Sequence, residues 1–249
     1  MPSAADPLLD ALRAQVRAIE SVASPSADSH LPFGVPAIDE RLAGGGLARG
    51  ALHEAAGASA GLGDDAAATL FVAGIAARLN GQVLWVLTRH DLFSPALAQA
   101  GLPPERLIYA ECRKDEDALA VAEEGVRHKG ICVVVAEVSR VGMTATRRLQ
   151  LAAEESHTTA LLLRRWRNAA DPLAAPSAAA TRWRIGCSPS QVLPVSGIAR
   201  PRWTVELVRQ RGGPTHNWLM EGSDEAGRLA PLSGARHRTV APERIRVAA

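Results

Sequence analysis

A glycine-rich turn between Gly57 and Asp65 is the part of the sequence whose residue types and spacing come nearest to a known chemistry. Its three glycines, Gly57, Gly61 and Gly63, follow a short apolar segment and precede a helical pattern. A strand, a glycine-rich turn and a helix in this order are the context of a phosphate-binding loop. In such a loop, G-x-x-x-x-G-K-[ST], backbone amides surround the phosphates, the lysine reaches the terminal ones and the hydroxyl holds magnesium. The turn is therefore the first candidate site.

The start of the helix after this turn carries carboxylates where a working loop carries a lysine and a hydroxyl. Asp64 and Asp65 occupy these positions, and the two lysines of the chain, Lys114 and Lys129, lie elsewhere in the sequence. Carboxylates at a helix N-terminus interact favourably with the helix dipole but repel a triphosphate. We expect a vestigial loop, made of a tight turn and a capped helix, and the alternative is a nucleotide bridged to the loop by a metal ion.

A carboxylate at the end of a buried strand, which holds magnesium through water, is the second element of this chemistry. The strongest buried-strand pattern, ICVVVA at 131–136, runs into Ala136 and then Glu137. Glu137 faces the site only if the strand end is displaced by one residue, and we expect instead a solvated residue beyond the sheet. Because the lysine and the strand-end aspartate are both missing, the sequence predicts the frame of an ATPase with no catalytic residue and no cofactor.

Apolar runs and helical patterns alternate along the middle of the chain. Strands are expected at 51–56, 82–88, 106–112, 131–136 and 159–163, and helices at 65–79, 94–100, 115–128 and 144–155. Strands that alternate with crossover helices predict an α/β fold with a mostly parallel sheet flanked by helices. The later segments 182–187, 203–209 and 216–221 have no helices between them and predict an antiparallel C-terminal extension of that sheet.

The N-terminal segment, residues 1–20, carries an apolar stripe at helical spacing, formed by Leu8, Leu9, Leu12, Val16 and Ile19. This pattern predicts a helix or arm that docks on a partner, and a helix folded back on its own core is the alternative. Residues 21–30 are typical of a linker. We expect the core to span 31–221 and a basic, flexible tail to span 222–249.

Charge is distributed unevenly along the chain. The formal net charge is +2, but residues 181–249 hold eleven arginines against five acidic residues, which indicates an anionic or acidic partner. The segment 164–167 (RRWR) follows a predicted strand, and arginine beside an aromatic ring can stack on bases and pair with phosphates. A solvated basic turn is the alternative. The candidate DNA or partner contacts are Arg164, Arg165, Trp166, Arg167, Arg182, Arg184, Arg200 and Arg202.

Several classes of protein are disfavoured by the sequence. No apolar run approaches the roughly 18 residues of a membrane-spanning helix, and the N-terminus lacks the layout of a signal peptide. The three cysteines are isolated, without a C-x-x-C pair, and the histidines show no metal-ligand spacing. We therefore expect a cytoplasmic, nucleoid-associated protein without a disulfide framework or a metal site.

Two segments of the chain resemble the RecA core. Residues 31–57 resemble its start, where a Gly-Ile/Leu-Asp-x-x-Leu segment and a Gly-Gly-Leu-x-x-Gly segment precede the ATP loop, and residues 97–138 follow its order of helix, strand, helix and terminal strand. The resemblance covers roughly residues 31–188. It implies a RecA-like core with a degenerate phosphate loop, because the lysine, the strand-end aspartate and the catalytic glutamate of RecA (about Arg89 by position) are absent.

A RecA-like chain of this length, with a lost ATP loop and an arginine-rich C-terminal region, resembles the ImuA family of RecA-related accessory proteins of bacterial translesion synthesis. The resemblance implies a non-catalytic adaptor of a mutasome complex that acts in DNA damage tolerance and SOS mutagenesis. It implies as partners an ImuB-like inactive Y-family polymerase homologue, an error-prone C-family polymerase alpha subunit (indirectly), RecA and DNA. The alternatives are a SulA-like cell-division inhibitor, which binds a division filament protein, and a DNA-binding RecA paralogue with residual ATPase activity.

Overall fold

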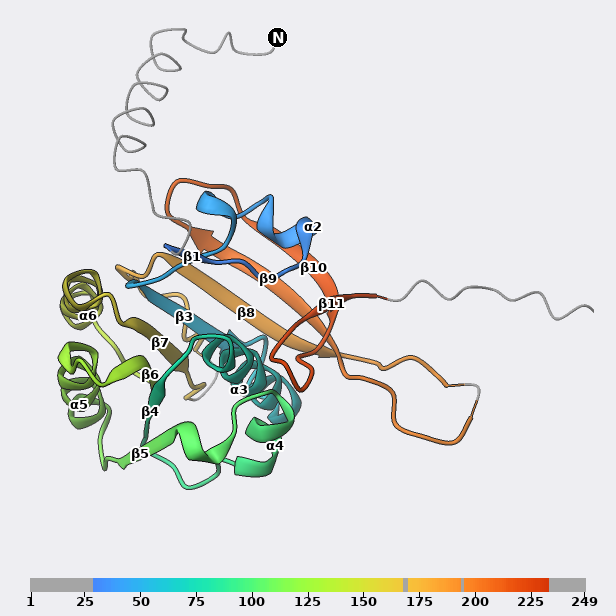
Figure 1. The fold of residues 1–249 in the computed structure, drawn as a ribbon, viewed down its shortest axis with the longest axis horizontal. Helices are drawn as coiled ribbons and strands as arrows, with labels where there is room; N and C mark the ends of the chain where they lie inside the picture. Colours follow the sequence, from blue (N-terminus) through green and yellow to red (C-terminus); the bar gives the residue numbers. More distant parts are fainter. Residues whose placement is uncertain (1–28, 168–169, 194, 233–249) are drawn as a thin grey trace, which may run out of the picture.

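The computed structural model describes residues 29–167, 170–193 and 195–232, which build an α/β fold around one large sheet (Figure 1). The strands of this sheet are β3 (Leu52–Gly57), β4 (Gln82–Leu87), β5 (Leu107–Glu111), β6 (Ile131–Val138), β7 (Thr159–Arg164), β8 (Thr181–Ser188), β9 (Arg202–Gln210), β10 (His216–Glu221) and β11 (Ala230–Pro231). The helices are α2 (Pro36–Asp39), α3 (Leu62–Ala77), α4 (Ser94–Gln99), α5 (Asp115–Arg127) and α6 (Met143–Ser156). Two short strands, β1 (His30–Leu31) and β2 (Leu47–Ala48), form a separate antiparallel pair.

The strand order of the large sheet is β11-β10-β9-β8-β3-β7-β6-β4-β5. All pairs from β5 to β8 are parallel, whereas β9 pairs antiparallel with β8, and β10 pairs antiparallel with β9. The mostly parallel sheet and its antiparallel extension are therefore confirmed. Each strand and helix predicted between residues 51 and 221 is present, with ends that agree to within about three residues.

Helices cover both faces of the parallel part of the sheet, as Figure 1 shows, with α3 on one face and α5 and α6 on the other. Side chains alternate between the faces along each strand. On β7, Leu161 and Leu163 pack on the α3 side, while Ala160 and Leu162 pack on the side of α5 and α6. This alternation places Arg164, the last residue of β7, and Arg165, which follows it, on opposite faces of the sheet.

Trp183 anchors the core on the α3 side of the sheet. Its ring lies 5.5 Å from the ring centroid of Phe33 and 5.6 Å from that of Phe71, and its exposed fraction is 1%. Trp203 is also buried. Both indoles therefore face inward, as alternation with arginine along β8 and β9 predicts.

The first part of the predicted C-terminal tail lies on the core. The sequence places the start of the tail at Gly222, but Leu229 is buried and β11 pairs with β10. Arg200 holds this segment, because its guanidinium donates hydrogen bonds to the carbonyl oxygens of Gly222 and Arg228. Residues 222–232 thus extend the core, and the rest of the predicted tail, 233–249, lies outside the described residues.

The predicted N-terminal helix, with its stripe from Leu8 to Ile19, also lies outside the described residues, as do residues 21–28 of the predicted linker. Among the helices that the structure describes, none has both the length and the apolar composition needed to cross a membrane.

Candidate functional site at the carboxyl edge of the sheet

The glycine-rich turn joins the end of β3 to the start of α3, in the position predicted for it. A Cβ atom on Gly57 would lie 2.9 Å from the backbone carbonyl carbon of Asp64, so the close approach of helix and strand requires glycine there. The indole Nε1 of Trp166 donates a hydrogen bond of 2.8 Å to the carbonyl oxygen of Gly57. Strand, turn and helix are therefore tightly packed, and the segment after β7 closes over them.

The Asp64 carboxylate is used to fix the turn. It accepts a hydrogen bond of 2.5 Å from the hydroxyl of Ser59 and one of 2.7 Å from the backbone N–H of Cys187, which lies in β8. The Ser59 hydroxyl in turn accepts the N–H of Gly61. Asp64 thus ties the turn to itself and to β8. The capped helix that the sequence predicts is wrong, because the N-cap residue of α3 is Gly61 and no side chain makes a capping hydrogen bond there.

Asp65 belongs to a buried ion triad with Arg165 and Glu137. The Arg165 guanidinium lies 2.9 Å from Oδ1 of Asp65 and 2.7 Å from Oε2 of Glu137, and it also donates to the hydroxyl of Thr69. Arg165 is 5% exposed and Glu137 is 1% exposed. Burial alone would lower the pKa of Arg165, but the charges of Glu137 and Asp65 outweigh it and raise that pKa, so the guanidinium stays charged.

The expectation that Glu137 is a solvated residue beyond the sheet is wrong. Glu137 lies within β6, where the period of two directs its side chain to the α3 face, toward the turn. The indole N–H of Trp85 donates to its Oε1 at 2.7 Å, and Arg165 donates to its Oε2 through both Nε and Nη2. The interpretation in which the glutamate faces the site is the one that the structure supports.

This triad sets what the site can do chemically. Arg165 places its guanidinium between the carboxylate at the helix start and the carboxylate from the end of β6, so both already have a cation. A nucleotide phosphate entering there would meet two carboxylates balanced by a single positive charge, and displacing Arg165 would break a buried ion pair. Within the described ranges, His, Cys, Asp and Glu side chains form no group of three or more suited to a metal ion.

A second buried ion cluster lies on the opposite face of the sheet. Glu54 of β3 accepts from Arg182 of β8 at 2.8 Å and from Arg164 of β7 at 3.3 Å, and the hydroxyl of Ser177 donates to it at 2.8 Å. All three charged side chains are at most 6% exposed. Glu54 was not among the residues predicted from the sequence. The signal that could have found it is a charged residue inside the apolar strand segment LHEAAG.

The structure separates the eight candidate DNA or partner contacts into buried and exposed groups. The predicted roles of Arg164, Arg165 and Arg182 in surface contacts are wrong, because these side chains are buried in the two ion clusters. Trp166 is half-buried against the turn. Arg167 is exposed.

The other three candidates are half-buried and already have polar partners. Arg184 forms ion pairs of 2.7 Å with Asp171 and 2.9 Å with Glu206. Arg200 holds the segment after β10, and Arg202 donates to the side-chain oxygen of Gln191. Most of the candidate arginines in the C-terminal part of the chain therefore have partners within the protein, where the structure describes them.

Exposed basic residues lie instead just after the carboxyl ends of the parallel strands. Most of them were not predicted as contacts from the sequence. They are Arg113 and Lys114 after β5, Arg140 after β6 and Arg167 after β7. Carboxyl ends of parallel strands meet at one edge of the sheet, so residues far apart in sequence converge there. Arg140 sits on a turn whose backbone N–H groups at 139 and 140 are held by the carboxylate of Asp115.

Comparison with known proteins supplies the family. The chain matches no family model. Protein ImuA from two strains of Caulobacter vibrioides is 39% identical to this chain over 209 residues, which span 79% of this chain and 84% of that protein. The crystal structure of SulA from Pseudomonas aeruginosa aligns with a TM-score of 0.40 and 22% identity, over 46% of this chain and 98% of SulA. The identity to ImuA over most of both sequences shows that the chain belongs to the ImuA family.

Proposed function

We propose that this protein is a non-catalytic, RecA-like adaptor that acts in bacterial DNA damage tolerance through protein–protein contacts. Membership of the ImuA family implies a role in the DNA damage response or mutagenesis. The observation that carries the adaptor proposal is the Asp65–Arg165–Glu137 triad, because a buried guanidinium takes up both carboxylates of the turn. In this proposal the turn is a degenerate phosphate loop, and its helix and strand are kept as a scaffold.

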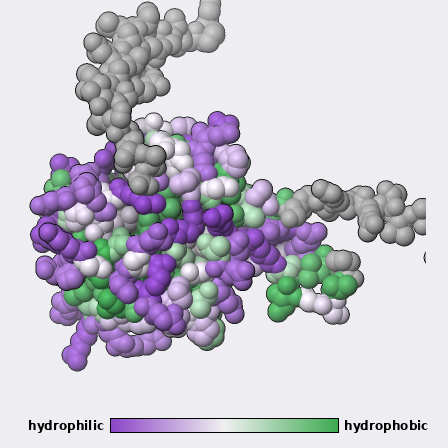
Figure 2. Space-filling model, viewed as in Figure 1, coloured by the Kyte–Doolittle hydropathy of each residue, from purple (hydrophilic) through white to green (hydrophobic). Residues whose placement is uncertain are grey.

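A projecting apolar surface supports a role in protein contacts. The connection between β8 and β9 extends away from the sheet, and Figure 2 shows a cluster of hydrophobic residues on it. Val192, Val195 and Ile198 are 90%, 70% and 100% exposed. Contiguous exposed aliphatic side chains are typical of interaction sites. This apolar connection and the N-terminal stripe are the two candidate docking elements of the adaptor.

The partner proposed for these elements is the ImuB-like inactive Y-family polymerase homologue. Through it the complex would reach an error-prone C-family polymerase alpha subunit, with RecA and DNA as further proposed partners in SOS mutagenesis. Such assembly would proceed without nucleotide hydrolysis.

Co-purification of the full-length chain with the ImuB-like protein tests this function. We expect a complex that forms equally well in ATP-depleted and ATP-supplemented lysate. Leu12→Asp should weaken it at least about tenfold if the N-terminal stripe docks, because a charge would replace a buried aliphatic contact. Val192→Asp with Ile198→Asp should do so if the apolar connection docks.

Matched controls exist for both docking elements. Ala14→Asp places the same charge on the opposite side of the predicted N-terminal helix, and Ser190→Asp with Ser196→Asp places two charges at polar positions of the same connection. These variants should co-purify as the wild type does. A wild-type chain that never co-purifies with the ImuB-like protein, or does so only during ATP turnover, would refute the adaptor function.

A further inference from the structure

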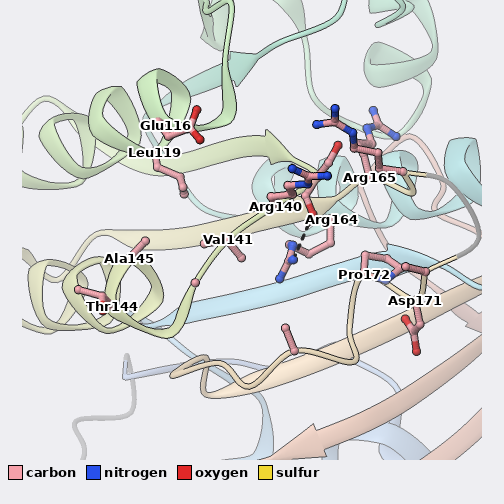
Figure 3. A pocket seen from close by; sticks show the side chains of 15 residues that line it. Glu116, Leu119, Arg140, Val141, Thr144, Ala145, Arg164, Arg165, Asp171 and Pro172 are labelled. Carbon is pink, nitrogen blue, oxygen red and sulfur yellow. Dashed lines mark hydrogen bonds between the residues drawn. The ribbon is translucent and has the colours of Figure 1, made fainter.

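A pocket lies at the carboxyl edge of the sheet, on the other face of the sheet from α3. It encloses about 690 Å³ between the loop after β6, the start of α6 and the segment after β7 (Figure 3). Arg140, Val141 and Gly142 form one wall, and Arg167, Asp171 and Pro172 contribute from the segment after β7. Figure 3 labels Arg140 and Arg164 among the side chains that line this pocket. Arg165 also lines the pocket, but its guanidinium is held by Asp65 and Glu137.

Positive charge prevails among the residues that line the pocket. Arg140 and Arg167 are exposed, and neither has an ion-pair partner among the described residues. Two carboxylates also line it, but Asp171 is already paired with Arg184, at 2.7 Å. Glu116 on α5 remains as the single opposing charge in this lining. The pocket therefore offers more cationic than anionic groups to a ligand.

Beneath these exposed cations lies a buried guanidinium with an unused donor. Arg164 lines the pocket and is 3% exposed, and its Nε has no hydrogen-bond partner in the described structure. Its other nitrogens donate to Glu54 and to the carbonyl oxygen of Ser139, both at 3.3 Å. Glu54 is shared with Arg182, so this buried cluster carries one more positive charge than negative. Burial without full compensation is costly for a charge, and an anion in the pocket would offset that cost.

The N-terminus of α6 adds backbone donors to the same space. This helix has 14 residues and its N-cap residue is Gly142. No side chain therefore caps the helix at this position, and the first turn contains no acidic residue. The first N–H groups of a helix lack partners within the helix, and the helix dipole makes that end positive. Gly142, Thr144 and Ala145 line the pocket, so these donors lie at its wall.

We propose that this pocket binds a phosphate group through Arg140, Arg167 and the first turn of α6, with the buried positive charge of Arg164 beneath it. Phosphate matches the donors because it presents several strong acceptor oxygens to guanidinium and helix N–H groups at once. The phosphate can belong to a free nucleotide or to the backbone of a single-stranded nucleic acid. The inference rests on the pocket alone and does not depend on the adaptor function.

Fluorescence anisotropy of a labelled 20-nucleotide single-stranded DNA with the full chain tests the proposal. We expect saturable binding that inorganic phosphate and thymidine monophosphate compete away. Arg140→Ala with Arg167→Ala should weaken binding about tenfold or more, because each guanidinium supplies charge-assisted hydrogen bonds to the phosphate. The log–log salt slope should shrink by about 1.4, or about 0.7 for each lost single-strand phosphate contact.

Two further variants make the result specific to the pocket. Thr144→Glu adds a carboxylate at the start of α6, which blocks an anion while favouring the helix dipole, so it should abolish binding without lowering the melting temperature. Arg41→Ala with Lys129→Ala removes the same charge from exposed positions elsewhere and should bind as the wild type does.

The competition arms identify the source of the phosphate. If thymidine monophosphate binds as tightly as the oligonucleotide, with the same sensitivity to the variants, the pocket takes a single nucleotide. If only the oligonucleotide binds tightly, the pocket takes a nucleic-acid strand. The proposal is overturned if neither probe binds, if the control double variant loses binding equally, or if a polyglutamate peptide binds the pocket and the phosphate probes do not.

Discussion

Arg165→Met should lower the free energy of unfolding by about 3–5 kcal/mol, the usual cost of breaking a buried ion pair by removing one partner. The substitution keeps most of the side-chain volume but leaves the buried carboxylate of Glu137 and the carboxylate of Asp65 without their shared cation. Urea unfolding followed by circular dichroism measures the loss, and an unchanged slope shows that the cooperative transition is retained. Arg167→Met, at an exposed position two residues further on, is the matched control and should cost less than about 1 kcal/mol.

A double variant separates charge from packing in this triad. Glu137→Gln added to Arg165→Met removes the unpaired buried charge, while the amide oxygen still accepts the indole N–H of Trp85. The double variant should recover part of the stability that Arg165→Met loses, because a buried neutral amide costs less than a buried unpaired carboxylate. An Arg165→Met protein as stable as the wild type would mean that the triad does not hold the turn.

Glu54→Gln is expected to have an effect of similar size on the other face of the sheet. The amide keeps the shape of the side chain, but Arg164 and Arg182 lose the one carboxylate that they share. Two buried guanidiniums would then face each other without compensation, so we expect a loss of about 3–5 kcal/mol. Chemical unfolding gives the value.

Glu206→Gln is the control for this second prediction. Its carboxylate also pairs with an arginine, Arg184, but its side chain is 42% exposed, where an ion pair contributes about 0–1 kcal/mol. Equal losses for Glu54→Gln and Glu206→Gln would contradict the claim that burial makes the first cluster essential.

Most of the fold could be predicted because its strands are covered on both faces. ICVVVA is short, apolar throughout and rich in β-branched residues, which favours a buried strand, and the alternation with helical patterns predicted the parallel order. The short elements at the N-terminal side of the core, β1, β2 and α2, were not predicted, since two to four residues show no period. The inclusion of residues 222–232 in the core was missed because a Gly- and Arg-rich composition conceals the contacts that Arg200 makes with them.

The candidate site could be predicted only as far as its local parts. The glycines and aspartates of the turn were found because their chemistry depends on neighbours in sequence. The roles of Arg164 and Arg165 were missed because they depend on partners more distant in sequence: Arg164 pairs with Glu54, 110 residues away, and Arg165 pairs with Glu137, 28 residues away. A run of arginines is typical of an exposed basic patch. Here the alternation of side chains along the strand directs Arg164 and Arg165 to opposite faces of the sheet, where both are buried.

The central claim, that the turn is a scaffold and not a nucleotide site, is tested most directly by phosphate release from magnesium-ATP by the purified full-length chain. Because Arg165 fills the space between Asp65 and Glu137, we expect no turnover above a protein-free control at any ATP concentration. Saturable turnover that is lost when Asp65 is changed to Ala would contradict it.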